Sequence, residues 1–397
     1  MTTQLIKDKA DNQVSLKQET SNTYTIYCLE FQTTKMSKCE PSDLPECQWT
    51  KMLWATIPIG LLVTGTFGNI LNIVVLSRRR MRQYPTTVYL LCLSFGDCTF
   101  LWLGMGSRML LQGYDIDVKA LSPFLCKVII WLPVTCAGYS VWVIVLMTFE
   151  RVLLTRWPVS AKVKLTRRNT VKIVVVLFAM CVSLTCHFLY VSKLVVNENT
   201  DGSNMNKYRC TYTDGPNVEF YTKRWPFIVL FVLNIVPMVL VICGNITIAV
   251  SIIIQRKKMA KVNPVSQHLA NQGGNPKKIK TATKTLFFVS AMFIITSLPF
   301  TLGNVVMSLQ RSRTPLEAAR KQLIYTSLRH LMYCNFTFNF VLYFVSGTQF
   351  KREWHSLIGD AKNTIGRYLG LHNPATGHTQ TNTVSNQNDT QLTDSQM

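Results

Sequence analysis

Seven long apolar segments, separated by short polar ones, dominate the pattern of hydrophobic and polar positions along the chain. They cover residues 52–76, 86–111, 121–155, 171–194, 225–254, 285–310 and 322–344. Each segment is long enough to cross a bilayer as an α-helix, because a helix of about 20 residues spans the hydrocarbon core. The pattern therefore predicts an all-α membrane protein in which residues 52–346 form a seven-transmembrane helix bundle.

The flanking regions follow other patterns. Residues 1–51 are polar and lack the apolar core of a signal peptide, which predicts an N-terminal tail. Residues 347–369 interleave bulky apolar side chains with lysine and arginine, as expected of a short amphipathic helix on the membrane surface. Residues 370–397 are rich in Thr, Asn, Gln and Ser and have too little apolar area to fold, so we expect a disordered tail.

Composition and charge set the topology. The 397 residues carry a net charge of +22, yet only 16% are charged and 48% are hydrophobic. Alternate loops hold basic residues and no acid: Arg78, Arg79, Arg80, Arg82, Arg156, Lys162, Lys164, Arg167, Arg168, Arg256, Lys257, Lys258, Lys261, Lys277, Lys278 and Lys280. Such loops stay in the cytosol. We therefore expect a multi-pass membrane protein with its N-terminus outside and its C-terminus inside. Confinement of the basic residues to short loops argues against nucleic-acid binding.

Short motifs occupy fixed places in the apolar segments. They are Gly68-Asn69, Leu93-Ser94-Phe95-Gly96-Asp97, Cys126 with Cys210, Glu150-Arg151-Val152 followed by Pro158, Pro237, Phe293 with Pro299, and Asn339-Phe340-Val341-Leu342-Tyr343. In order and spacing, over roughly residues 52–358, the chain resembles the rhodopsin-like (class A) G protein-coupled receptors. The last motif and Arg108 look most similar to invertebrate neuropeptide receptors, including FMRFamide-type receptors.

The chain also departs from the usual pattern of that family. Val152 stands where a tyrosine is usual, Ser297 where an aromatic residue is usual, and Asn245 where a tyrosine is usual. Phe340 replaces the usual seventh-segment proline, so we expect a softened kink at that point. These changes bear on the details of the activation switch rather than on the fold.

The resemblance implies a disulfide bond between Cys126 and Cys210, which would pin the 195–224 loop over the third segment. The alternative is two unpaired thiols. Cys28, Cys39 and Cys47 leave an odd number of cysteines outside, and their pairing stays open.

The resemblance also implies an allosteric sodium site around Asp97. A carboxylate inside a bilayer needs partners, and Ser140, Asn335 and Asn339 would supply oxygen atoms beside it. The alternative is a protonated Asp97 in a hydrogen-bond network without an ion. We expect no other cofactor.

A third implied feature is the switch that couples to a G protein. Glu150 would hold Arg151 at rest, and activation would free Arg151. The further switch residues are Pro237, Phe293, Pro299, Asn339 and Tyr343. Two alternatives stay open: Arg151 only anchors its helix at the membrane surface, and the prolines bend their helices without any motion.

Two arginines indicate a ligand cavity. Arg108 and Arg329 each lie about 15 Å along a helix from the membrane centre toward the outer mouth. The expected ligand-binding set is Arg108, Trp131, Trp225, Asn304, Tyr325, Arg329 and His330. Alternatively, Arg329 pairs with Glu219 or another loop acid as a structural latch.

The resemblance thus implies a plasma-membrane receptor that binds an extracellular neuropeptide and activates a heterotrimeric G protein. The tail would be phosphorylated by a receptor kinase and would recruit arrestin, and the basic loops would contact membrane lipid. A non-peptide small ligand and, less favoured, a membrane transporter are the alternatives. An opsin is excluded because residues 322–344 contain no lysine, and a monoamine receptor is disfavoured because residues 128–149 contain no aspartate. No intramembrane catalytic motif occurs, so we expect no enzyme activity.

Overall fold

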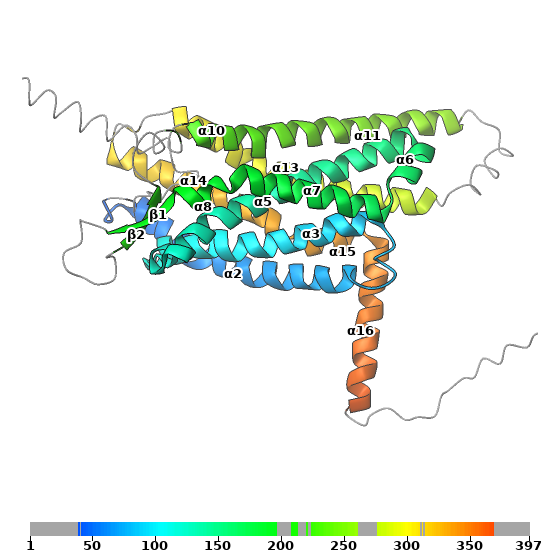
Figure 1. Ribbon diagram of the computed structural model, residues 1–397, viewed down its shortest axis with the longest axis horizontal. Helices are drawn as coiled ribbons and strands as arrows, with labels where there is room; N and C mark the ends of the chain where they lie inside the picture. Colours follow the sequence, from blue (N-terminus) through cyan, green and yellow to red (C-terminus); the bar gives the residue numbers. More distant parts are fainter. Residues whose placement is uncertain are drawn as a thin grey trace, which may run out of the picture. The chain divides into compact units, whose positions relative to one another are not determined.

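The computed structural model describes residues 39, 41–196, 208–212, 220, 224–260, 276–309, 312 and 314–368. The chain divides into two compact units, Met1–Glu353 and Trp354–Met397. The first unit contains the helix bundle shown in Figure 1, and the described part of the second is the remainder of one helix.

The first half of the bundle consists of α2 (Pro45–Leu76), α3 (Pro85–Thr99), η1 (Phe100–Gly106), α4 (Ser107–Tyr114), η2 (Val118–Leu121), α5 (Pro123–Arg156), α6 (Pro158–Lys164), α7 (Arg167–Thr185) and α8 (His187–Val191). A two-stranded hairpin follows, β1 (Ser192–Val196) and β2 (Tyr208–Tyr212). The second half consists of α10 (Trp225–Leu230), η5 (Phe231–Ile235), α11 (Val236–Ala260), α13 (Pro276–Leu309), α14 (Pro315–Thr337), α15 (Asn339–Ser346) and α16 (Thr348–Tyr368).

Among the described residues, six helical segments are long and apolar enough to cross a membrane. The seventh predicted span corresponds to α14 and α15. It does not meet the same measure of hydropathy, because α14 carries Arg320, Lys321, Arg329 and His330. It nevertheless packs against α2 and α13 and so belongs to the bundle.

Proline and capping side chains fix where several helices begin. Ser122 precedes Pro123 and accepts a hydrogen bond from the backbone N–H of Leu125 at 3.1 Å. Thr314 precedes Pro315 and caps α14 in the same way. These are the residue types favoured at the N-cap and the first helical position. The same proline signal starts α2 at Pro45, inside the segment 1–51 that the sequence analysis treats as a tail.

The fourth predicted span, 171–194, ends earlier than expected. The helix stops at Val191, and β1 pairs antiparallel with β2 from Ser192 onward, with Leu194 opposite Cys210. Disulfide bonds join Cys126 to Cys210 and Cys39 to Cys47. The first confirms the implied pairing, the second resolves part of the open one, and Cys28 lies outside the described residues. We call this end of the bundle the disulfide end.

Among the described residues of the spans, two stretches of π-helix, η1 and η5, interrupt the α-helices. Pro237 lies at the start of α11, directly after η5, and Pro299 lies inside α13. The hydropathy pattern does not predict η1, which contains no proline. At Gly104 in η1, a Cβ would lie 3.3 Å from Pro133 of α5, so the glycine allows the two segments to pack closely.

The seventh span is interrupted at Phe338 although Phe340 replaces the usual proline. Asn69 donates its side-chain N–H to the carbonyl of Phe336 at 2.9 Å, and so ties the backbone just before the interruption to α2. The helix is therefore interrupted between α14 and α15 without a proline, and the expected softening of the kink stays a prediction.

The helix α16 covers most of the segment predicted to be amphipathic. Within the first unit, Phe350 packs against Phe340 and Tyr343. The buried Glu353 carboxylate lies 3.3 Å from Arg78 and 3.8 Å from Arg80. The start of α16 is thereby held to the loop between α2 and α3. Residues 370–397, predicted to be a tail, lie outside the described residues.

Candidate functional site

A cavity of about 160 Å³ lies within the bundle. Its lining comes from η1, α4, η2, α5, η5, α13 and α14. It extends from Lys119, close to the disulfide end, to Phe293 and Asn335 deeper in the bundle. By comparison, an apolar cavity of about 150 Å³ accepts benzene, so the space suits one side chain or chain end.

Three cationic side chains line this cavity: Arg108 from α4, Lys119 from η2 and Arg329 from α14. Among the described residues of the lining there is no aspartate or glutamate. We call the site the basic cavity. The remainder of its wall is largely apolar, including Ile130, Phe300 and Phe336.

The buried Arg329 side chain is held by aromatic neighbours. It donates a hydrogen bond to the Tyr325 hydroxyl, one helical turn earlier. Its guanidinium carbon lies 4.3 Å from the centroid of the Tyr325 ring and 5.8 Å from that of Phe300. Such contacts stabilise a cation in an apolar wall and fix its direction.

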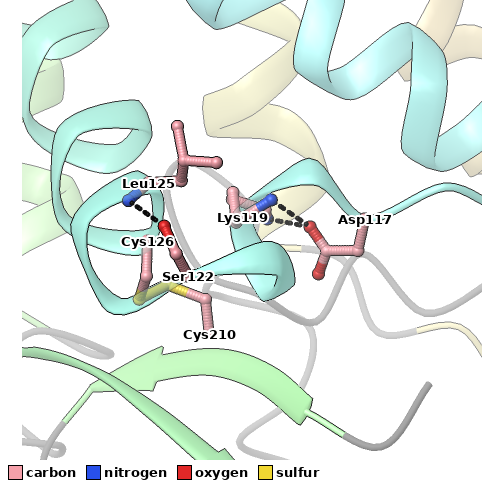
Figure 2. The surroundings of a disulfide bond; sticks show 6 residues. All are labelled: Asp117, Lys119, Ser122, Leu125, Cys126 and Cys210. Carbon is pink, nitrogen blue, oxygen red and sulfur yellow. Dashed lines mark hydrogen bonds and ion pairs between the residues drawn. A yellow bond between two sulfur atoms is a disulfide. The ribbon is translucent and has the colours of Figure 1, made fainter. Parts of the chain in front are cut away.

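Lys119 is positioned by a short capped turn. Asp117 accepts a hydrogen bond from the backbone N–H of Lys119 at 3.1 Å, and its Oδ1 lies 4.0 Å from the Lys119 Nζ (Figure 2). The η2 turn packs against both α5 and β2, and the disulfide between Cys126 and Cys210 joins these two elements. The disulfide therefore helps to hold Lys119 at the cavity.

Below the basic cavity lies a buried polar network. Asn335 lines the cavity, and Asn339, one turn further, donates a hydrogen bond to Asp97 Oδ2 at 2.6 Å. Ser140 donates to Asp97 Oδ1 at 3.3 Å. At Gly96 a Cβ would lie only 2.8 Å from Ser140 Oγ, so α3 approaches α5 here because position 96 has no side chain. The structure thus brings together Asp97, Ser140 and Asn339 as the sequence predicts.

At the opposite end of the bundle, Glu150 and Arg151 are both buried. Arg151 lies 3.8 Å from Glu150 Oε1 and donates a hydrogen bond to the hydroxyl of Thr86. Thr86 in turn lies 3.3 Å from Glu150 Oε1. The three side chains form a small closed cluster between α3 and α5.

A model of the rhodopsin family, described as "7 transmembrane receptor (rhodopsin family)", matches residues 68–343. This match covers most of the bundle, including Asp97, Glu150, Arg151 and Tyr343. The chain belongs to the rhodopsin family of seven-transmembrane receptors. It is therefore a receptor of the plasma membrane that crosses the bilayer several times, and not an enzyme.

The receptor is similar to several characterised proteins at low identity. It is 25% identical over 292 residues to the growth hormone secretagogue receptor type 1 of Sus scrofa, covering 72% of each chain. It is 21% identical over 304 residues to the neuromedin-U receptor 2 of Rattus norvegicus, covering 75% of this chain and 73% of that one. It is 26% identical over 134 residues to the FMRFamide peptide receptor frpr-18 of Caenorhabditis elegans, covering 32% and 31%.

Five residues predicted to bind ligand do not line the receptor's cavity. Trp225 and Trp131 pack with the cluster around the Cys126–Cys210 disulfide, which includes Phe188 and Val191. His330 lies against Trp54, with ring centroids 4.7 Å apart. Tyr325 supports Arg329, and Asn304 lies on α13. Contact of these five with ligand stays a prediction.

The residues of the predicted switch lie in several parts of the bundle. Phe293 forms part of the cavity wall, and Pro299 lies inside α13, close in sequence to the lining residues Ser297 and Phe300. Tyr343 is buried, and its hydroxyl has no hydrogen-bond partner among the described residues. Asn245, which replaces the usual tyrosine, donates to the carbonyl of Val241 at 2.9 Å within its own helix.

Sequence reasoning missed Lys119. The residue lies in the short loop 112–123, whose mixture of acidic and basic residues gives no sign of a cavity. The available signal was the Asp117–Lys119 spacing, since an aspartate two residues before a backbone N–H typically forms a tight turn. That turn directs the loop inward.

Proposed function

We propose that the receptor binds an extracellular peptide in the basic cavity and activates a heterotrimeric G protein at the opposite face. In this arrangement the N-terminus is extracellular and the C-terminus cytoplasmic. The positive-inside rule supports the orientation, because the loops remote from the disulfide end are basic and contain no acid. Disulfide bonds also persist on the outer side of a membrane.

The observation that carries the proposal is the continuity between the cavity and the buried polar network. Asn335 lines the cavity, and Asn339 on the next turn binds Asp97. Phe293 of α13 lines the same cavity, six residues before Pro299. A ligand that favours one packing of these side chains shifts the population of helix arrangements by its difference in affinity for the two states.

The similarities favour a peptide as the ligand. One similar protein is named as a receptor for FMRFamide peptides and another as a receptor for neuromedin-U. In this proposal the cavity holds one end of the peptide. The hairpin β1–β2 lies at the disulfide end of the bundle, where the hairpin can contact the rest of the peptide. A non-peptide ligand of similar size is the competing candidate.

At the cytoplasmic face, Arg151 is the proposed contact with the G protein. In the structure it is held by Glu150 and Thr86. Activation would separate this cluster and present the guanidinium to the G protein. The tail would carry the contacts of a receptor kinase and arrestin through Thr376, Thr379, Thr381, Thr383, Ser385, Thr390, Thr393 and Ser395. The basic residues of α16 would lie on anionic lipid.

A sodium ion beside Asp97 is part of the proposal. The carboxylate and the Ser140 hydroxyl are oxygen donors suited to a hard cation, and Asn339 would turn its amide oxygen toward it. Bound sodium would favour the inactive packing. Agonist affinity should therefore fall as sodium replaces choline in the buffer, and Asp97→Asn should remove that dependence. An equal sodium effect in the variant would contradict the site.

The proposed function is tested by a panel of secreted peptides applied to cells that express the full chain, with calcium and cyclic AMP as readouts. We expect a dose-dependent response that is absent from cells without the receptor. A response to small metabolites but to none of the peptides would favour the non-peptide candidate instead.

A further inference from the structure

We infer that one side of the basic cavity is a binding subsite for an aromatic ring, and that Gly104 keeps this subsite open. It consists of Phe100 and Gly104 from η1, Pro133 from α5, and Tyr333 and Phe336 from α14. We call these five residues the aromatic floor. The inference rests on the proposed function, because it names the chemical class of the group that the ligand places there.

The first step concerns the rings of the aromatic floor. The ring centroid of Phe100 lies 4.3 Å from that of Phe336 and 5.8 Å from that of Tyr333, with interplanar angles of 37° and 51°. Tilted rings at such separations attract one another beyond the effect of burial alone. Phe100 is only partly buried and lines the cavity, so a ligand ring can extend this cluster.

The second step concerns what lies behind the rings. Tyr333 and Phe336 belong to a buried cluster that also contains Trp54 and Leu101, and Phe100 packs against that cluster. Trp54 and Leu101 have no exposed surface. The rings are therefore held in place before a ligand arrives, and a preformed site loses less of the binding free energy to ordering.

The third step concerns Gly104. A Cβ at this position would lie 3.2 Å from Cδ2 of Phe100 and 3.3 Å from Cβ of Pro133, which is closer than ordinary van der Waals contact. A methyl group there would displace the Phe100 ring or fill the space beside it. Gly104 lies in the π-helix η1, and π-helical segments frequently occur at functional sites. The absence of a side chain at position 104 thus keeps the floor accessible.

The fourth step concerns size and polarity. The whole cavity measures about 160 Å³, and an apolar cavity of about 150 Å³ accepts benzene. None of the five residues of the aromatic floor is charged, and the Tyr333 hydroxyl is the only polar side-chain group among them. A flat apolar group therefore suits the floor, and this match does not depend on how the cations of the cavity are paired.

The aromatic floor also lies close to the buried polar network. Phe100 follows Asp97 by three residues, and Phe336 precedes Asn339 by three, so each ring is about one helical turn from a member of the network. A ligand ring on the floor is therefore well placed to favour one packing of the helices that carry Asp97 and Asn339.

The experiment compares two neutral probes that differ in the aromaticity of one six-membered ring, N-acetyl-phenylalanine amide and N-acetyl-cyclohexylalanine amide. The purified full-chain receptor is held in nanodiscs, and empty nanodiscs correct for the partition of each probe into lipid. Saturation-transfer NMR titration gives the dissociation constants.

We expect the phenyl probe to bind about two- to tenfold more tightly than the cyclohexyl probe, because an aromatic pair contributes that much beyond its buried area. Equal affinities, or tighter binding of the cyclohexyl probe, would overturn the inference.

Two glycine variants locate the subsite. Gly104→Ala should weaken binding of the phenyl probe by about fivefold or more, because the added methyl group crowds Phe100 and Pro133. Gly60→Ala is the matched control: it makes the same change in another helix, where a Cβ would meet nothing within 4 Å, and should leave the affinity unchanged. Unchanged affinity in Gly104→Ala, or equal losses in the two variants, would contradict the site.

Phe100→Leu keeps the test decisive if Gly104→Ala fails to fold. Leucine is an apolar residue that favours helices, and it removes the ring from position 100. In a variant that still melts cooperatively, the preference for the phenyl probe over the cyclohexyl probe should disappear. A preference that persists would show that the Phe100 ring does not form the subsite.

The outcomes separate this inference from the proposed function. A preference for the phenyl probe in a receptor that no peptide activates would support the aromatic floor and remove the peptide-agonist proposal. Activation by a peptide, with no preference between the two probes, would do the reverse.

Discussion

The positive charges at the two ends of the bundle have different surroundings. At the end opposite the disulfide bonds, Arg151 lies 3.8 Å from Glu150, and Arg78 lies 3.3 Å from Glu353. At the disulfide end, three cations line the basic cavity and no described carboxylate joins them in its wall. The first two pairs fasten neighbouring elements to one another, whereas the three cations of the basic cavity lie in a wall that a ligand can contact.

The largest expected effect concerns Arg151. Arg151→Ala should reduce agonist-stimulated nucleotide exchange on the G protein to background, because it removes the proposed contact and opens the cluster with Glu150. Exchange in membranes is measured after matching surface expression. Arg156→Ala, at the end of the same helix, should have a smaller effect. Exchange in Arg151→Ala at the wild-type rate would show that this arginine only anchors its helix.

The two disulfides should differ in their contribution to stability. The Cys126–Cys210 bond closes a separation of 84 residues and the Cys39–Cys47 bond one of 8. Loop-closure entropy gives about 4.5 kcal/mol for the first and about 2.5 kcal/mol for the second. Cys126→Ser and Cys210→Ser should lower the melting temperature equally, and more than Cys39→Ser. A larger loss in Cys39→Ser would mean that the short loop orders more of the disulfide end than its length indicates.

These cases show what the sequence predicts well. The spans follow from hydropathy, and the contact of Asp97 with Ser140 and Asn339 was implied by the resemblance to the receptor family. Lys119 was missed because its position depends on a turn held by Asp117 and the hairpin, which no periodicity reveals. Trp131 and Trp225 were expected in the cavity, but both pack with the cluster at the disulfide.

The irregular backbone was predicted less well. The break at Phe338 occurs without the proline that usually marks it, and η1 forms in a segment whose only signal is its glycines. Both depend on tertiary contacts, the first through Asn69 and the second through the packing of Gly104 against Pro133. Local sequence does not encode such contacts.

The start of α16 offers a test of the paired charges. Glu353→Gln removes a buried carboxylate and leaves the partly buried Arg78 without that charge, so we expect a loss of about 1–3 kcal/mol. Thermal denaturation in detergent measures it. Arg80→Gln is the matched control, because the Arg80 side chain is 75% exposed and its pair should contribute less than ~1 kcal/mol. Equal losses in the two variants would show that the pair of Glu353 with Arg78 does not hold the start of α16.

The smallest effect is expected at the rim of the disulfide end. Arg320 lies 3.2 Å from Glu46, with 64% of its side chain exposed. Arg320→Gln should change stability by less than ~1 kcal/mol, and salt should erase the difference. A large, salt-independent loss would show that this pair fastens α14 to α2.

The central claim, that the basic cavity faces the outside and Arg151 the cytosol, is tested most directly by thiol labelling of intact cells. Lys193→Cys, at an exposed position of β1 at the disulfide end, and Arg156→Cys are treated with a membrane-impermeant thiol reagent, with the wild-type chain as background. The account predicts labelling of Lys193→Cys on intact cells and of Arg156→Cys only after permeabilisation. Labelling in the reverse order would contradict it.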